Sequence, residues 1–210
     1  MTISRIRNWR LYLIVDLELF PRINILEAVQ EATAAGISAL QLRVKQASTR
    51  DFFHLATQLA SFLQSSSIPF IINDRVDIAL ACGADGVHLG QDDLPPEVAR
   101  KILGPNKIIG LSVNTVTEAR EAARSGVDYL GVGPIFPTSS KKNLRPLLGL
   151  EGLQKIRQVT SLPILAIGGI NPENAAGVLQ AGADGVAVIS AILGAADITQ
   201  QVKRFLQVLK

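Results

Sequence analysis

Cysteine, histidine and long hydrophobic runs are all scarce in this sequence of 210 residues. The single cysteine, Cys82, excludes an intrachain disulfide and any metal cluster built from several cysteines. No apolar run approaches the ~18 residues that a membrane-spanning helix needs. The first apolar run, residues 11–15, is too short for a signal peptide and ends at Asp16. We therefore expect a soluble, cytoplasmic protein that has no membrane partner.

A large excess of charge of one sign is also absent. The chain has 21 Lys and Arg against 18 Asp and Glu, which gives a formal net charge of only +3. So small and dispersed an excess does not predict binding to nucleic acid or to a membrane surface. The fingerprints GxGxxG and GxxxxGK[ST] are missing too, which disfavours a doubly wound sheet that binds a dinucleotide or nucleotide.

The sequence does contain an internal repeat of one pattern. Its four copies read AAGISALQLR at 34–43, CGADGVHLG at 82–90, SGVDYLGVG at 125–133 and AGADGVAVIS at 181–190. In each copy a helix ends at glycine, a short turn follows, and an apolar strand begins. We interpret Asp85, Asp128 and Asp184 as residues of these turns rather than as catalytic acids.

Further apolar strands alternate with the repeats, at 11–15, 69–72, 107–111 and 163–167. Helical patterns fill the gaps at 25–35, 49–63, 75–81, 96–103, 115–124, 150–159, 172–180 and 198–209. Eight strands that alternate with eight helices close a parallel sheet into a barrel. The prediction is an α/β fold, a single (β/α)8 TIM barrel that forms one domain over residues 1–210. Asn114 and Asn171 are the expected N-caps of the helices that follow them.

Polar residues gather at the C-terminal ends of the strands, where barrels of this kind carry their active sites. Gln41, Arg43 and Lys45 alternate along one side of the second strand. Two cations at the barrel mouth favour a phosphate or diphosphate ligand. In the alternative interpretation, Arg43 pairs with a carboxylate of the barrel and Lys45 is solvated.

Carboxylates follow the next two strands. Asn73 and Asp74 come after the third strand, and Asp92 and Asp93 come after the fourth. Carboxylates on neighbouring strand ends, close to two cations, suggest a divalent cation that bridges to phosphate oxygens. An equally good interpretation is that Asp74, and Asp92 or Asp93, cap the helices that follow them.

The later strand ends carry hydroxyls, lysines and glycines. Ser112 follows the fifth strand, and the long loop 133–149 after the sixth places Thr138, Ser139 and Ser140 beside Lys141 and Lys142. A loop of this length inside a compact domain is usually either a functional lid or disordered. Hydroxyls next to lysine suit a phosphate.

The last two loops carry the Gly168–Gly169 pair and residues 189–192. These positions are a frequent phosphate site of the fold. His88 lies inside the fourth strand, where we expect it to pack in the barrel interior.

Taken in order, these segments resemble the thiamine phosphate synthase family. That family carries QLR-x-K, IINDR-VD-ALA, GADGVHLGQ-x-DLP, GxS, GPIFPT-x-[ST]K, AIGGI and GADGVAV-x-S. In this chain the seven motifs stand at 41–45, 71–81, 83–95, 110–112, 133–141, 166–170 and 182–190. The ordered set covers nearly the whole chain and is highly specific, whereas the terminal glycines alone would not be.

The resemblance implies a Mg²⁺-dependent transferase of thiamine biosynthesis. It would join 4-amino-2-methyl-5-hydroxymethylpyrimidine diphosphate to 4-methyl-5-(2-phosphoethyl)thiazole by a dissociative substitution that releases diphosphate. Its expected partners are therefore phosphorylated small molecules, and self-association into a homo-oligomer is left open.

The resemblance also implies roles for individual residues. The pyrimidine diphosphate would be held by Gln41, Arg43, Lys45, Asn73, Ser112 and Lys141. Of these, the catalytic group would comprise Arg43, Lys45, Ser112 and Lys141. The metal would be bound by Asp74 and Asp93. The thiazole phosphate would be held by Thr138, Ser140, Gly169, Ile189 and Ser190.

Two positions depart from the family pattern, which usually has Glu at Val44 and His at Asn114. Strand alternation places Val44 opposite Arg43 and Lys45, so we expect little effect there, and Asn114 is expected to affect the neighbouring loop. Two other functions are weighed as alternatives. A thiazole tautomerase of the same barrel family would not need Asn73, Asp74 or Asp93. A non-catalytic thiazole-phosphate-binding protein would lose the pyrimidine side.

Overall fold

The computed structural model describes residues 6–138 and 145–210, and these form a closed barrel of eight parallel strands. The strands follow each other around the barrel in chain order, and β8 pairs back with β1. They are β1 (Leu11–Asp16), β2 (Ala39–Arg43), β3 (Phe70–Asn73), β4 (Gly86–Leu89), β5 (Ile108–Val113), β6 (Tyr129–Val132), β7 (Ile164–Ile167) and β8 (Gly185–Val188). The predicted α/β barrel is confirmed.

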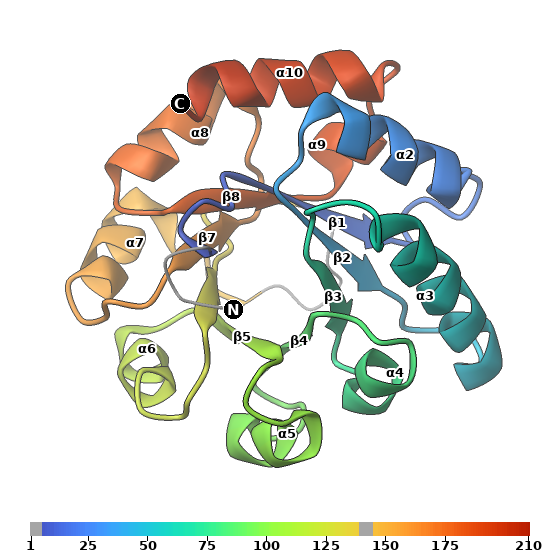
Figure 1. Ribbon diagram of the computed structural model, residues 1–210. Coiled ribbons are helices and arrows are strands. Elements are labelled where there is room, and N and C mark those ends of the chain that lie inside the picture. The colour runs from blue at the N-terminus through green and yellow to red at the C-terminus, as the bar shows by residue number, and fades with distance from the viewer. Residues whose placement is uncertain (1–5, 139–144) are drawn as a thin grey trace.

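Helices surround the barrel on its outside (Figure 1). They are α2 (Ile25–Ala35), α3 (Thr49–Leu63), α4 (Val76–Ala81), α5 (Pro96–Leu103), α6 (Val116–Ala122), α7 (Gly149–Arg157), α8 (Pro172–Gln180), α9 (Ser190–Leu193) and α10 (Ile198–Val208). The last helix, α10, packs against both α8 and α2, so the helical layer closes where the barrel closes. None of the helices in the described ranges is long and apolar enough to cross a membrane.

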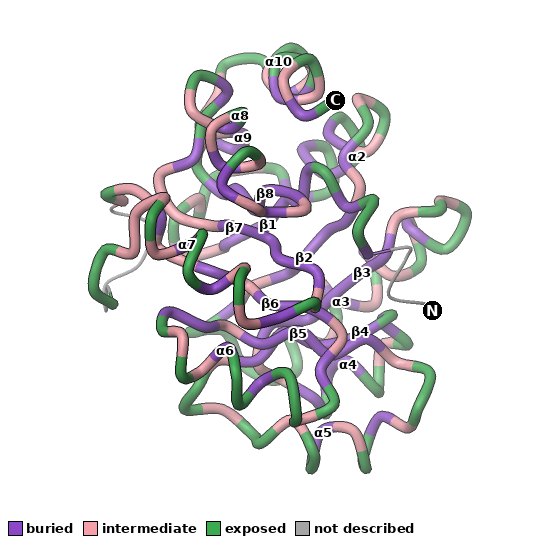
Figure 2. The backbone as a smooth tube through the Cα atoms, turned by 90° about the vertical axis from the view of Figure 1, so that its left-hand side faces the viewer, coloured by how far each residue is buried: buried purple, intermediate pink, exposed green. Residues whose placement is uncertain are grey.

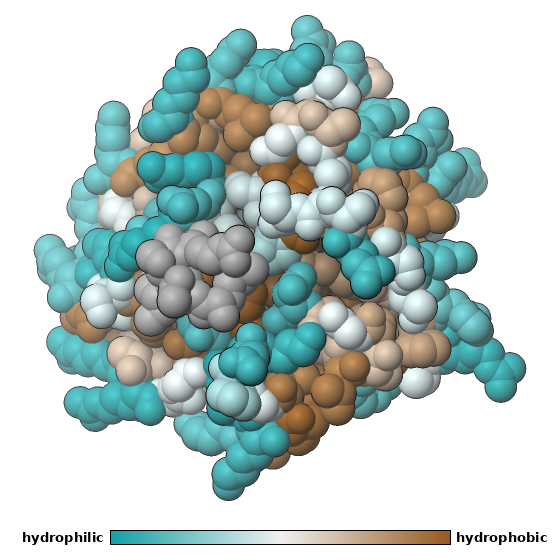
Figure 3. Space-filling model, viewed as in Figure 1, coloured by the Kyte–Doolittle hydropathy of each residue, from teal (hydrophilic) through white to brown (hydrophobic). Residues whose placement is uncertain are grey.

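The distribution of burial follows the two layers. Figure 2 shows the strands as buried segments through the middle of the molecule and the exposed segments on its outer turns. On the face seen in Figure 3, hydrophilic side chains project around most of the outline, and hydrophobic residues show as separate patches between them. The strands are nearly continuous apolar runs because a parallel barrel is covered on the outside by helices and filled on the inside by side chains.

The repeated turns tie the strands together at the N-terminal end of the barrel. The first or second residue of each odd-numbered strand donates its backbone N–H to a side-chain oxygen in the turn before the next strand, over 2.8 Å in all four cases. We call these side chains the turn acceptors: Ser38, Asp85, Asp128 and Asp184. The three aspartates therefore are turn residues, as the repeat pattern predicts, and they are far from the strand ends that carry the polar cluster.

Two local predictions are wrong. The short helix α9 begins directly after β8, where the sequence suggests only a loop, because four residues are too few to show a helical period. The N-cap of α6 is Thr115 rather than Asn114. Asn114 instead donates its side-chain amide to the carbonyl oxygens of Gly133 and Pro146, at 2.9 and 3.0 Å. Asn171 caps α8 as expected, with a reciprocal bond to Asn174.

Candidate active site

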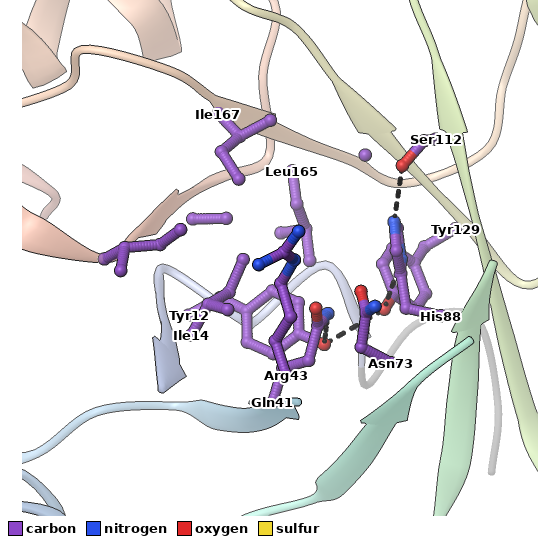
Figure 4. A pocket seen from close by; sticks show the side chains of 13 residues that line it. Tyr12, Ile14, Gln41, Arg43, Asn73, His88, Ser112, Tyr129, Leu165 and Ile167 are labelled. Atoms are coloured by element: carbon purple, nitrogen blue, oxygen red, sulfur yellow. Dashed lines mark hydrogen bonds between the residues drawn. The ribbon is translucent and has the colours of Figure 1, made fainter. Parts of the chain in front are cut away.

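The C-terminal end of the barrel contains a narrow pocket that opens into a wide cleft. The inner pocket is lined by residues of all eight strands and by one residue directly after β8 (Figure 4): Tyr12, Ile14, Gln41, Arg43, Asn73, His88, Ser112, Tyr129, Gly131, Leu165, Ile167, Ala187 and Ile189. The outer cleft lies above it and is lined by the loops that follow the strands. Paired positions two residues apart, such as Tyr12 and Ile14, line the inner pocket because side chains alternate along a strand.

Every described residue of the predicted site lines one of these two spaces. Gln41 lines the inner pocket, and Arg43, Asn73, Ser112 and Ile189 line both. The outer cleft also includes Lys45, Asp74, Asp93, Thr138, Gly169 and Ser190. The remaining two predicted residues, Ser140 and Lys141, lie outside the described residues, as do Ser139 and Lys142.

Arg43 is held by carboxylates from the end of β1. Its guanidinium forms an ion pair with Asp16, whose side chain is fully buried, and lies 3.7 Å from Glu18. Burial raises the pKa of Asp16, while the Arg43 charge opposes that rise. The pairing that the sequence left as an alternative for Arg43 is therefore present, yet Arg43 still lines both spaces. A fixed guanidinium with donors left over can still bind an oxyanion.

Glu18 connects the ends of β1 and β2. Its Oε1 accepts the backbone N–H groups of Lys45 and Gln46, at 2.6 and 2.9 Å. Burial alone would raise the pKa of Glu18, but these two N–H donors lower it. The carboxylate therefore fixes the backbone that carries Lys45.

Lys45, Asp74 and Asp93 form a second charged group across the ends of β2, β3 and β4. The Lys45 ammonium pairs with Asp74, and 47% of the Lys45 side chain is exposed, so Lys45 is both ion-paired and in contact with solvent. Burial raises the pKa of Asp74, the adjacent Asp93 carboxyl raises it further, and Lys45 opposes both effects. Two carboxylates held together at this cost are typical of a cation site.

Neither of these carboxylates caps a helix. The N-caps of α4 and α5 are Arg75 and Pro95, and neither helix has a side-chain cap. Asp93 instead accepts the backbone N–H of Gly90 over 2.6 Å. Asp74 has a backbone φ of 62°, the only positive value outside glycine in the described ranges. Such strain is common at functional sites, and here it places the carboxyl in the outer cleft.

The donor set fits Mg²⁺ in part. Within the described ranges no three or more His, Cys, Asp or Glu side chains gather around one point. Two carboxylates alone do not make a closed metal cage. Mg²⁺ is usually bound by one or two carboxylates that are completed by water and substrate phosphate oxygens, and Asp74 and Asp93 match that pattern.

Glycines shape the opposite side of the cleft, after β7. Gly168 and Gly169 have φ values of 103° and 64°, in the left-handed region. A Cβ at Gly168 would lie 2.7 Å from Pro134, and a Cβ at Gly169 would lie 2.5 Å from the Pro137 carbonyl. The loop after β7 therefore packs directly on the loop after β6, and only glycine fits there. Ile189 and Ser190, at the start of α9, complete this side.

The expectation of little effect at Val44 stays a prediction. β2 ends at Arg43, so Val44 lies one residue beyond the strand from which that expectation was argued. Val44 is buried and lines the outer cleft beside Lys45. Asn114 contacts a neighbouring loop, as expected. Its side-chain amide donates two hydrogen bonds to backbone carbonyls near the two ends of the loop after β6.

Sequence reasoning missed the carboxylates of β1 and the hydrogen bonds below the cleft. Asp16 stands at the C-terminal end of β1. A search for polar residues at strand ends that included the first strand would have found it. His88 is buried, as expected, but it also bonds to Tyr129 and Ser112, at 2.9 Å each. No local pattern signals those contacts, because the partners lie 41 and 24 residues away in the sequence.

Comparison with known proteins assigns this arrangement to one family. Residues 11–192 match the family described as thiamine monophosphate synthase. The thiamine-phosphate synthase of Moorella thermoacetica is 50% identical over 202 residues, and that of Syntrophomonas wolfei is 49% identical over 201. Each alignment covers 96% of both chains. The solved structure of thiamine phosphate pyrophosphorylase from Pyrococcus furiosus is 43% identical, with a TM-score of 0.87 over 98% of this chain and 97% of that one.

Proposed function

The chain belongs to the thiamine monophosphate synthase family, and we propose that it joins the two halves of thiamine phosphate. It is a transferase of thiamine biosynthesis. The substrates are 4-amino-2-methyl-5-hydroxymethylpyrimidine diphosphate and 4-methyl-5-(2-phosphoethyl)thiazole, and the products are thiamine phosphate and diphosphate. The whole chain acts as one catalytic domain, and we expect it to work in the cytoplasm.

The pyrimidine diphosphate binds on the side of β2 to β5. Gln41 and Asn73 contact the pyrimidine end, and both line the inner pocket. Arg43, Lys45 and Ser112 hold the diphosphate at the rim, together with Lys141, which is assigned on the family pattern alone. Cationic donors are effective here because negative charge develops on the leaving diphosphate.

The thiazole phosphate binds on the side of β7 and β8. Gly169, Ile189 and Ser190 line this side of the cleft, and the glycine backbone allows close approach of N–H groups to the phosphate. Thr138 comes from the loop after β6 and lines the same cleft, and Ser140 is assigned on the family pattern. The phosphate end is thereby fixed, which directs the thiazole nitrogen toward the centre of the cleft.

Asp74 and Asp93 would hold Mg²⁺, which when bound neutralises charge on the leaving diphosphate. The reaction is a dissociative substitution in which the bond from the pyrimidine methylene to the diphosphate oxygen breaks first. The thiazole nitrogen then supplies its electron pair to the methylene carbon. This chemistry needs no strong base and no covalent nucleophile, in agreement with a cleft rich in Arg, Lys and Asp.

One observation carries the proposal. The cleft has a charged side at the ends of β2 to β4 and a glycine-lined side after β7 and β8, and these two sides lie across the barrel from each other. β3 and β4 stand four places from β7 and β8 in a ring of eight. A tautomerase would have no need of Asp74 and Asp93, and a thiazole-phosphate-binding protein would have no need of the charged half. Two ligands on opposite walls are what a condensation requires.

The test is product formation by the purified protein. Both substrates are mixed with the enzyme, and thiamine phosphate is quantified by chromatography with Mg²⁺ present or with a chelator in its place. The expected result is thiamine phosphate only when both substrates and Mg²⁺ are present. Full activity in the chelator would remove the metal from the account, and no product under any condition would refute the function.

A further inference from the structure

A continuous chain of hydrogen bonds runs across the inner pocket, from β2 to β5 (Figure 4). Gln41 Nε2 lies 2.8 Å from the Tyr12 hydroxyl, which lies 3.1 Å from the Tyr129 hydroxyl. The Tyr129 hydroxyl lies 2.9 Å from His88 Nδ1, and His88 Nε2 lies 2.9 Å from the Ser112 hydroxyl. The chain therefore joins two residues of the proposed pyrimidine diphosphate site through three residues that no proposed contact uses.

Each buried hydroxyl proton needs an acceptor, and one arrangement of protons along this series of hydrogen bonds gives every donor an acceptor. Each hydroxyl carries one proton, so a Tyr12 oxygen that accepts from Gln41 can give its own proton to Tyr129. In this arrangement Tyr129 gives its proton to His88 Nδ1, which lies 2.9 Å from its hydroxyl. A neutral imidazole that accepts at Nδ1 carries its proton on Nε2. His88 then donates to Ser112, which accepts at its oxygen and directs its own proton elsewhere.

Burial keeps both tyrosines protonated, which the chain requires. The rings of Tyr12 and Tyr129 are almost completely buried, and burial raises the pKa of each phenol well above its usual value. Ring contacts hold them in place, because Trp9 packs against both, with ring centroids 5.6 and 5.5 Å away. Neither hydroxyl can leave the chain for bulk water.

Two glycines make room for the His88 and Tyr129 rings. A Cβ on Gly110 would lie 2.1 Å from the Tyr129 ring and 2.5 Å from His88 Nδ1. A Cβ on Gly131 would lie 2.8 Å from His88 Cε1. At either position a side chain would collide with the His88 imidazole and displace it. The backbone thus leaves His88 one position, in which each ring nitrogen faces a hydroxyl.

We infer that Tyr129 and His88 are positioning residues that keep Ser112 as a hydrogen-bond donor toward the diphosphate. The inference rests on the proposed function for the contact between Ser112 and the diphosphate. Its physical reason is that a phosphate oxygen accepts hydrogen bonds and carries negative charge. A serine that gave its proton to the imidazole would present only lone pairs to that oxygen, whereas a serine that accepts from Nε2–H presents its proton.

The tautomer of His88 tests this directly, without any substrate. The protein has only two histidines. The other one, His54, is exposed on α3, so the variant His54→Gln identifies which imidazole signals belong to His88. Nitrogen-15 NMR at a pH where the imidazole is neutral should place the proton of His88 on Nε2. Tyr129→Phe removes the donor to Nδ1 and should shift His88 toward the Nδ1–H form. A proton on Nδ1 in the unaltered protein, or an unchanged tautomer in Tyr129→Phe, overturns the inference.

Tyr12→Phe is the matched control, because it removes a hydroxyl from the same buried cluster but leaves the bond between Tyr129 and His88 in place. Its His88 tautomer should stay as in the unaltered protein. Tyr129→Phe should raise KM for the pyrimidine diphosphate about tenfold and leave KM for the thiazole phosphate within about twofold. Equal increases in both KM values would indicate general damage to the barrel and overturn the inference. Failure to make thiamine phosphate would refute the proposed function while the tautomer result stands.

Discussion

At the scale of single residues, the main lesson is that the cations of the cleft are paired before any ligand arrives. Arg43 has 18% of its side chain exposed and is held by the fully buried Asp16. An arginine fixed in this way loses little conformational entropy when it binds an anion, and its planar fork can serve two partners together. We therefore expect Arg43 to have both a structural and a binding role, and two substitutions separate these roles.

Arg43→Lys should keep the positive charge that Asp16 needs but lose the planar guanidinium, whose paired N–H groups can bind an oxyanion through two hydrogen bonds. We expect kcat/KM for the pyrimidine diphosphate to fall by roughly 2 kcal/mol of transition-state stabilisation, with little change in unfolding free energy. Arg43→Met leaves the Asp16 carboxylate buried without its ion-pair partner and should cost about 3 kcal/mol of unfolding free energy. Steady-state kinetics and urea unfolding measure the two effects. A fully active Arg43→Lys variant would show that the fork is not used.

Sequence reasoning found the residues whose spacing follows the strand period and missed those that meet through the fold. Gln41 and Arg43 alternate along one strand, so their common direction follows from the sequence. The bond between Tyr12 and Tyr129 joins residues 117 positions apart, and only the closed barrel brings them together. Val44 shows the limit of the period argument, because alternation ends with the strand at Arg43.

At the scale of elements, the hydrophobic period predicts every helix of six or more residues in the described ranges and misses the four-residue α9. The bounds of α2, α3, α5 and α8 agree with the predicted ranges, and α4, α6, α7 and α10 differ by one or two residues at an end. The four-residue α9 has no period to detect. The strands are recognisable because each repeat has the same turn before its strand, and the turn acceptors explain why that turn carries Asp or Ser.

The turn acceptors should contribute to stability and not to catalysis. Asp85→Ala leaves the Phe70 backbone N–H without its partner, and Phe70 is buried, so we expect a loss of roughly 1–3 kcal/mol in unfolding free energy. Asp85→Asn keeps an accepting oxygen and should lose less. Urea unfolding and kinetics below the transition measure both. A decrease in kcat/KM for Asp85→Ala without loss of stability would contradict the assignment to the turn.

At the scale of the whole molecule, the barrel places a charged surface and a glycine-lined surface on opposite sides of one cleft. The charged group of β2 to β4 and the glycine side of β7 and β8 are far apart in sequence but share one cleft. Closure of the ring by the pairing of β8 with β1 fixes the distance between them. The central claim is that Mg²⁺ and diphosphate belong to the first surface and the thiazole phosphate to the second.

Calorimetric titration of each ligand into matched variants tests that claim most directly. Magnesium diphosphate should bind Asp74→Asn and Asp93→Asn about tenfold or more weakly than the unaltered protein. It should bind Asp92→Asn, an exposed neighbour of Asp93, nearly unchanged. The thiazole phosphate alone should bind all four proteins equally. An undiminished response to magnesium diphosphate in both the Asp74 and Asp93 variants, or a parallel loss of thiazole phosphate binding, would contradict the two-sided site.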